Sequence, residues 1–136
     1  MLYLDTNIFF YASSKESLYF SECGRLLKEI VDGKVAATTS TETIQEIMHY
    51  YRSLKQDHIG LDICEGIIGT IPKLLSPSQE VIYLYLRLFP KYPKPQSRDL
   101  LHLATCVTYG IKTIVTFDRE FKKFSEVKAI SPSGLS

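Results

Sequence analysis

The stretch that decides the fold is residues 2–10, LYLDTNIFF, in which a short apolar run ends abruptly on the acid Asp5. Apolar residues directly before a carboxylate are typical of a short buried strand whose carboxyl end reaches the edge of a sheet. Asp5 could instead cap a helix over residues 6–11, or be an ordinary loop charge. Only partners from elsewhere in the chain can decide whether Asp5 belongs to a site.

The composition indicates one ordinary globular domain spanning residues 1–136, with 45% hydrophobic and 23% charged residues. We expect a cytoplasmic protein, because no apolar run approaches the roughly 20 residues of a membrane span and no basic stretch starts a signal sequence. Cys23, Cys64 and Cys106 lack metal-binding spacing, which predicts reduced, buried thiols. The net charge of +1 excludes a global attraction to nucleic acid, so any such binding needs a local patch.

Apolar spacing predicts strands that alternate with helices. We expect strands at 2–5, 35–39, 112–117 and 127–130, and helices at 16–31, 41–54, 59–71, 77–88, 98–109 and 118–124. Residues 74–75 are a candidate for a further strand. Pro90, Pro93 and Pro95 predict an extended loop, after which Ser97 caps the next helix. Strands that are apolar on both faces favour an α/β fold whose parallel sheet is covered on both sides, with ligands bound beyond the carboxyl ends of the strands.

Three acids fall where such a site would lie. Asp5 ends the first strand, and Asp118 directly follows the strand TIVTF. Asp99 lies in the first turn of a helix so apolar that it must be largely buried. Each also has an ordinary explanation, since an acid near a helix N-terminus is stabilised by the helix dipole alone.

A fourth acid, Glu46, is less clear. The helix from 41 to 54 has one apolar stripe, and the polar residues lie on its other side, where the simplest reading is a solvated face. The stripe comprises Ile44, Ile47, Met48 and Tyr51, and the polar side comprises Glu42, Glu46 and His49. Glu42 competes with Glu46 for any role. Acids gathered from separate elements suggest a site for Mg²⁺ or Mn²⁺, because hard cations prefer carboxylate oxygens.

Four stretches together resemble PIN-domain proteins, close to the toxin nucleases of VapBC-type systems. They are YLDTNIFFY at 3–11, TSTETIQEIMHY at 39–50, SRDLLHLATCVTYGI at 97–111 and TIVTFDREF at 113–121. The resemblance implies a PIN-like three-layer α/β/α sandwich with a central, mainly parallel sheet. It implies catalytic, metal-binding acids at Asp5, Glu46, Asp99 and Asp118, with Asn7 and Thr116 orienting them.

The same resemblance implies an Mg²⁺- or Mn²⁺-dependent endoribonuclease, the toxin of a type II toxin–antitoxin system. The expected partners are an RNA substrate, a cognate antitoxin and a second copy in a homodimer. Whether one or two metals bind is open, as are two alternatives: an RNA-processing PIN nuclease that is not a toxin, and a non-catalytic PIN-like module that binds RNA or protein.

Side chains around the acids suggest how RNA would be held. Arg98 adjoins Asp99, while Arg119 and Lys122 follow Asp118, and each could equally be a solvated surface charge. Tyr92 in the proline-rich loop could stack on a base. His102, one turn after Asp99, is expected to pack or to orient a neighbour rather than to catalyse.

Overall fold

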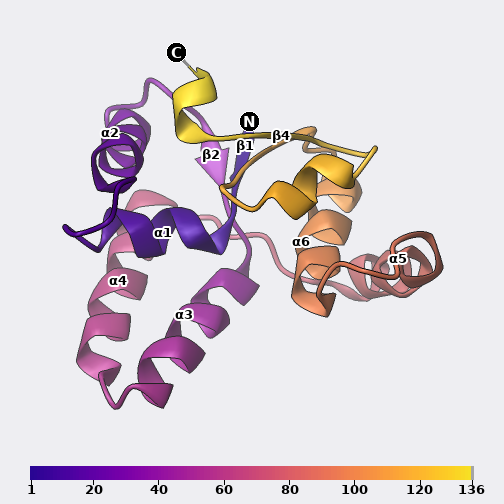
Figure 1. Ribbon diagram of the computed structural model, residues 1–136, viewed down its shortest axis with the longest axis horizontal. Helices are drawn as coiled ribbons and strands as arrows, with labels where there is room; N and C mark the ends of the chain where they lie inside the picture. Colours follow the sequence, from indigo (N-terminus) through magenta and orange to yellow (C-terminus); the bar gives the residue numbers. More distant parts are fainter. Residues whose placement is uncertain (136) are drawn as a thin grey trace.

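The computed structural model describes residues 1–135, and its centre is a sheet in which neighbouring strands are all parallel (Figure 1). The strand order is β2-β1-β3-β4. In chain order the strands are β1 (Leu2–Leu4), β2 (Ala37–Thr38), β3 (Thr113–Val115) and β4 (Lys128–Ile130). The chain runs outward from β1 to β2 and later returns to β3 on the other side of β1, so the strand order reverses between β1 and β3. Ligands bind at such a reversal in open parallel sheets.

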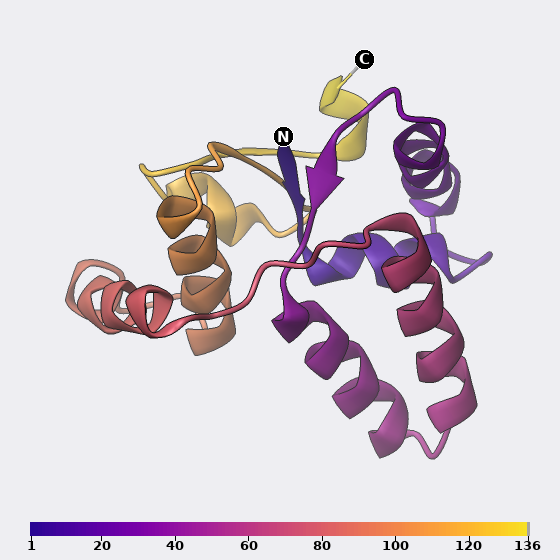
Figure 2. The same ribbon diagram turned by 180° about the vertical axis from the view of Figure 1, so that it is seen from behind.

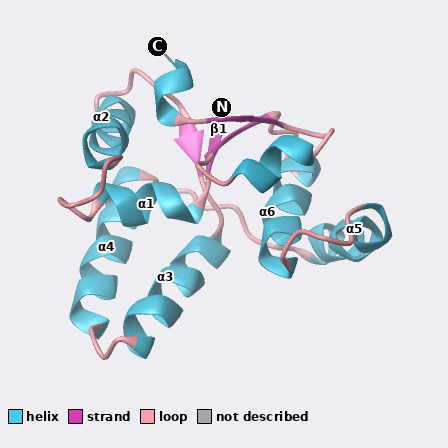
Figure 3. Ribbon diagram, viewed as in Figure 1, coloured by secondary structure: helices cyan, strands magenta, loops and turns pink. Residues whose placement is uncertain are grey.

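Helices cover both faces of this sheet. They are α1 (Thr6–Ala12), α2 (Phe20–Val31), α3 (Thr41–Ser53), α4 (Asp57–Thr70), α5 (Gln79–Lys91) and α6 (Ser97–Thr108), with short 3-10 turns η1 (Arg119–Lys123) and η2 (Pro132–Leu135). The helices α1 to α4 gather on one side of the strands and α5 with α6 on the other, as opposite views show (Figures 1 and 2). Figure 3 shows how small the sheet is between these layers. The predicted α/β/α sandwich with a parallel sheet is therefore confirmed.

Alternating side chains on the strands build two cores, one on each face. Tyr3 and Ile114 pack with the α5–α6 layer, whereas Leu4 and Val115 pack with the α1–α4 layer. All four side chains are fully buried. This explains why the strands read as continuously apolar in the sequence.

The proline-rich segment differs from its prediction. Helix α5 continues through Pro90 to Lys91, since proline in the last turn removes only one helical hydrogen bond and the Tyr92 N–H still reaches the Leu88 carbonyl at 2.9 Å. The next helix is capped by Gln96 rather than Ser97, and the Gln96 side chain makes no capping hydrogen bond.

Other details of the fold bear on the sequence predictions. Residues 74–75 contribute only a single parallel bridge, between Leu75 and Ser40, and α2 begins at Phe20 rather than at residue 16. Cys23, Cys64 and Cys106 are buried free thiols, as predicted. Every helix in residues 1–135 is too short or too polar to cross a lipid bilayer.

Candidate active site

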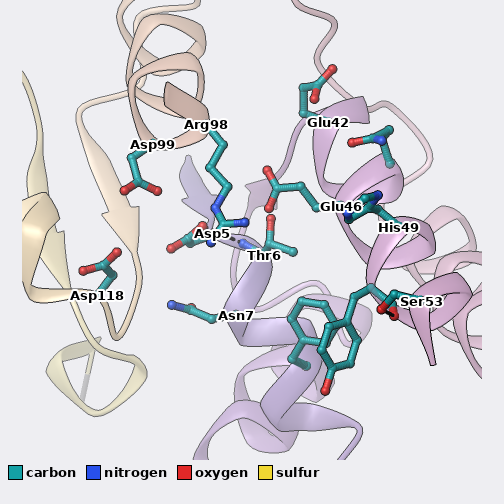
Figure 4. Close-up of a pocket in the computed structure, with 13 residues that line it drawn as sticks. Asp5, Thr6, Asn7, Glu42, Glu46, His49, Ser53, Arg98, Asp99 and Asp118 are labelled. Atoms are coloured by element: carbon teal, nitrogen blue, oxygen red, sulfur yellow. Dashed lines mark hydrogen bonds between the residues drawn. The ribbon is translucent and has the colours of Figure 1, made fainter. Parts of the chain in front are cut away.

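The carboxyl ends of β1 and β3 open into a cleft of about 650 Å³. Its walls come from α1, α3, the start of α6 and the loop after β3. The predicted acids Asp5, Glu46, Asp99 and Asp118 all line it, together with Asn7 and Arg98 (Figure 4). Four acids separated by up to 113 positions in the chain therefore share one cavity.

Asp5 is both a helix cap and a cleft residue, so two readings of its sequence context hold together. One carboxylate oxygen accepts a hydrogen bond from the Thr6 N–H at 2.7 Å and the other from the Thr116 hydroxyl at 2.6 Å. The side chain is buried, and burial raises its pKa above the usual value, against the opposing charge of His102 and these hydrogen bonds. The carboxylate is thus held firmly where β1 ends.

Thr116 joins the first acid to the last. Besides donating to Asp5, its hydroxyl oxygen accepts hydrogen bonds from the Asp118 N–H at 3.0 Å and from the Asn7 amide at 3.4 Å. Within residues 1–135, the Asn7 Oδ1 is buried and has no hydrogen-bond partner. These are the contacts that orienting residues would make, and they leave Asn7 with an acceptor to offer a ligand.

Asp99 and Asp118 face one another across the inner end of the cleft (Figure 4). Asp118 caps η1, its carboxylate accepting from the Glu120 N–H at 2.9 Å. Asp99 is 8% exposed, and burial, followed by the charges of Asp118 and Asp5, raises its pKa to about 6. Carboxylates that repel each other in this way would be relieved by a bound cation.

Glu46 points into the cleft, contrary to the solvated face suggested by the helical wheel. Its carboxylate is hydrogen-bonded to His102 Nε2 at 2.7 Å, and only 17% of its side chain is exposed. Glu46 is turned inward by a contact between helices, because α6 places His102 opposite the polar side of α3. Figure 4 shows Glu46 directed toward Asp5 and Arg98. Glu42 also lines the cleft, but its side chain points away from these two residues.

His102 is the link that holds Glu46. The imidazole is fully buried, and its Nδ1 is hydrogen-bonded to the Tyr3 hydroxyl. Burial favours the neutral ring, but the hydrogen bond to Glu46 and the charge of Asp5 outweigh it, so the pKa of His102 is raised. Burial alone would raise the pKa of Glu46, yet its bond with His102 holds that pKa below the usual value. The expected orienting role of His102 agrees with these contacts.

A buried threonine chain beneath Glu46 was not predicted from the sequence. The Thr39 hydroxyl donates to the Leu4 carbonyl at 2.8 Å and is bonded to the Thr43 hydroxyl at 2.8 Å, which is in turn bonded to Thr6 at 3.2 Å. The chain ties α1 and α3 to the end of β1. The signal in the sequence was the run of small hydroxyl residues TTSTET at 38–43.

The predicted RNA contacts divide between two places. Arg98 reaches into the acidic cleft between Asp99 and Glu46 (Figure 4), while Arg119 and Lys122 line a second hollow beyond Asp118. Tyr92 lines neither, because its hydroxyl donates to Glu126 at 2.7 Å and its ring packs against Phe124. Tyr92 therefore stabilises its own loop.

A divalent cation fits this cleft, although the side chains are not closed around one. Within residues 1–135, no three acidic, histidine or cysteine side chains converge enough to enclose an ion. Mg²⁺ commonly uses only one or two carboxylates and keeps several waters. Asp99 and Asp118, which face one another, offer such a pair of carboxylates. Within residues 1–135, the buried Asn7 Oδ1 is a further acceptor that lacks a partner.

Comparison with known proteins shows the family to which the chain belongs. The sequence profile of the PIN domain matches residues 2–127. The chain belongs to the PIN domain family. This PIN domain is 25% identical to ribonuclease VapC13 of Mycobacterium tuberculosis over 131 residues, covering 96% of the chain and all of the relative. It is 28% identical to ribonuclease VapC7 of the same organism over 133 residues, covering 97% and 92%.

Solved structures share the fold of this PIN domain. VapBC2 from Rickettsia felis, bound to a fragment of its promoter DNA, superposes with a TM-score of 0.78 at 18% identity, covering 96% of this chain and 98% of the other. The M. tuberculosis toxin VapC20, which cleaves the sarcin–ricin loop, gives 0.74 at 13% identity, covering 93% and 98%. Both likenesses extend over nearly the whole chain, so the fold has no large insertion or deletion relative to either.

Proposed function

We propose that this PIN domain is a metal-dependent endoribonuclease that hydrolyses RNA phosphodiester bonds. The observation that carries the proposal is the convergence of Asp5, Glu46, Asp99 and Asp118, from four separate elements, in one cleft at the carboxyl edge of the sheet. Relatives named ribonucleases match over the length of the chain. All four acids are present, which argues against a non-catalytic binding module.

Asp99 and Asp118 would hold Mg²⁺ or Mn²⁺, with Asp5 and Glu46 as further ligands, directly or through water. A cation bound there would supply Lewis acidity toward the phosphate and lower the pKa of a water molecule. Thr116 and the Thr6 N–H fix the orientation of the Asp5 carboxylate. His102 does the same for Glu46. Arg98, exposed at the cleft mouth, is placed to bind the phosphate backbone of RNA.

We propose further that the enzyme is the toxin of a type II toxin–antitoxin system, with a cognate antitoxin and a homodimeric assembly. The likeness of the fold to VapBC structures from Rickettsia felis and Salmonella typhimurium supports this choice over an RNA-processing enzyme. Expression of the protein should arrest growth, and Asp5→Asn should suppress the arrest. Unimpaired growth with the active wild type would favour an RNA-processing role. Light scattering of the purified protein tests the dimer.

A cleavage assay tests the catalytic proposal. Purified protein is incubated with transfer, ribosomal and messenger RNAs in Mg²⁺ or Mn²⁺, and EDTA should stop cleavage. Asp5→Asn and Asp99→Asn should abolish it, and asparagine at position 5 can still cap α1. Products should carry 5′-phosphate and 3′-hydroxyl ends, as the family resemblance implies.

Helix α3 provides a matched pair of glutamates for the same assay. Glu46→Gln should lower kcat by about tenfold or more, since it alters a carboxylate directed at the other acids. Glu42→Gln, one turn earlier and pointing away, should leave kcat within about twofold. Cleavage by Asp5→Asn and Asp99→Asn at the wild-type rate would overturn the proposed function.

A further inference from the structure

A second hollow, of about 460 Å³, lies on the far side of Asp118, which lines both cavities. It is formed by Tyr19 and the first turn of α2, the segment from β3 into η1, strand β4 and η2. The two hollows therefore adjoin at Asp118. The side chains that line this hollow differ in kind from those of the acidic cleft.

One wall is aromatic and held rigid. The ring of Tyr19 stacks on Phe117 with centroids 4.2 Å apart and planes 24° from parallel. Tyr11 packs edge-on against both rings, each at 5.2 Å. Tyr19 nevertheless remains 38% exposed. Tyr19 is therefore partly accessible to a ligand, and because its ring already packs against Phe117 and Tyr11, binding would cost little further side-chain entropy of Tyr19.

The hollow also carries positive charges that form no ion pair within residues 1–135. Arg119 and Lys122 both line it and are exposed. Within residues 1–135, neither makes an ion pair, whereas Lys123 on the same turn is paired with Glu120 at 3.2 Å. Glu22 also lines the hollow, opposite in sign to these cations. Two free cations beside an exposed aromatic ring match a phosphate backbone and a base of single-stranded nucleic acid.

We propose that this hollow is a nucleotide subsite, which holds the residue of single-stranded RNA adjacent to the scissile phosphate. Tyr19 stacks on the base, and Arg119 and Lys122 bind the flanking phosphates. The inference rests on the proposed ribonuclease function, because the shared residue Asp118 connects the subsite to the acids. It makes Tyr19 a specificity-determining residue, since stacking depends on the base presented there.

Binding of a fluorescein-labelled 12-nucleotide uridine oligomer tests the subsite, by anisotropy in Mg²⁺ at several salt concentrations. The Asp5→Asn protein is the background, so that the oligomer stays intact. Arg119→Ala and Lys122→Ala should each reduce the slope of log K against log salt by about 0.7, the value for one lost contact to a single strand. The matched control Lys123→Ala should change the slope clearly less.

Tyr19→Ala should weaken binding by about tenfold, whereas Tyr19→Phe, which keeps the ring, should bind within about twofold of the background protein. Thermal melting checks that Tyr19→Ala is folded. If Tyr19→Ala is not folded, the salt slopes of Arg119→Ala and Lys122→Ala test the subsite instead.

Two outcomes overturn the subsite: an oligomer that does not bind at all, or cation variants whose slopes equal that of Lys123→Ala. The hollow would then serve another partner, such as a protein. Metal-dependent cleavage by the wild type that is lost in Asp5→Asn would still uphold the proposed function. If the wild type does not cleave RNA but the salt slopes of Arg119→Ala and Lys122→Ala fall as expected, the proposed ribonuclease function is wrong and the hollow is an RNA-binding surface.

Discussion

Replacing Asp99 by asparagine should stabilise the cation-free protein at neutral pH, although it should destroy activity. The pKa of Asp99 is about 6 in the folded protein and near 3.8 when unperturbed. A carboxyl whose pKa is raised by folding contributes stability below its unfolded pKa and loses it as pH rises through the folded pKa. The wild type should therefore lose stability between about pH 4 and pH 6, and the asparagine variant should lose less, because only Asp5, whose pKa is also raised, still titrates there.

The magnitude follows from this gap of 2.2 pH units at about 1.36 kcal/mol each, which sets an upper limit of about 3 kcal/mol. The carboxylate faces an open cleft, so solvent screening reduces the expected gain to about 1–2 kcal/mol. Asparagine forfeits little, because within residues 1–135 the Asp99 carboxylate accepts no hydrogen bond. Repulsion from Asp118 and Asp5 is removed with the charge.

Urea unfolding in EDTA at pH 7.5 and at pH 4 measures the effect. The variant should be more stable than the wild type at pH 7.5, and the difference should shrink toward pH 4. Adding Mn²⁺ at pH 7.5 should stabilise the wild type more than the variant. Glu65→Gln, an exposed acid on α4, is the control for the change in net charge. A variant less stable than the wild type at pH 7.5, or a difference independent of pH, would refute the reasoning.

Two further sites offer clear tests. Thr116→Val keeps the shape of the side chain but removes the hydrogen bond to Asp5. It should therefore lower the free energy of unfolding by about 1–2 kcal/mol and lower kcat at saturating Mg²⁺. Wild-type values of both quantities would contradict the orienting role. Gly60→Val should destabilise the protein by about 1–3 kcal/mol in urea unfolding, because a Cβ there would lie 3.0 Å from Met48 Sδ where α3 packs on α4. Gly66→Ala on the same helix meets open space and should instead stabilise by about 0.5–1 kcal/mol, so equal effects would show that packing at Gly60 is not limiting.

Strand ends were the most predictable part of the site. Apolar runs that stop at Asp5 and just before Asp118 identify where buried strands leave the sheet, and parallel strands bring such ends to one edge. Asp5 also shows that the alternatives were not exclusive, because it caps α1 and lines the cleft. The two roles use different oxygens of one carboxylate, since Oδ1 accepts from the Thr6 N–H at the cap and Oδ2 accepts from Thr116.

Glu46 could not be placed by periodicity. The helical wheel separates an apolar stripe from a polar side, but it does not say whether water or another layer faces that side. The family resemblance selected Glu46, and the structure shows why Glu42 differs. Of these two glutamates, Glu46 is the one hydrogen-bonded to His102, which lies 56 positions away in the chain. The details at Pro90 and Gln96 depended in the same way on packing that local propensity does not describe.

The amino-acid sequence by itself determined the α/β class, the parallel sheet, the buried thiols and the acids at strand ends. These features follow from the spacing of apolar residues and from where each apolar run stops, and both are local properties of the sequence. Only the tertiary structure decided that Glu46 turns inward, that Thr116 joins Asp5 to Asp118, and that free cations lie beside a stacked Tyr19. These features arise where layers distant in the chain come into contact, and a contact between two elements depends on the orientation of both.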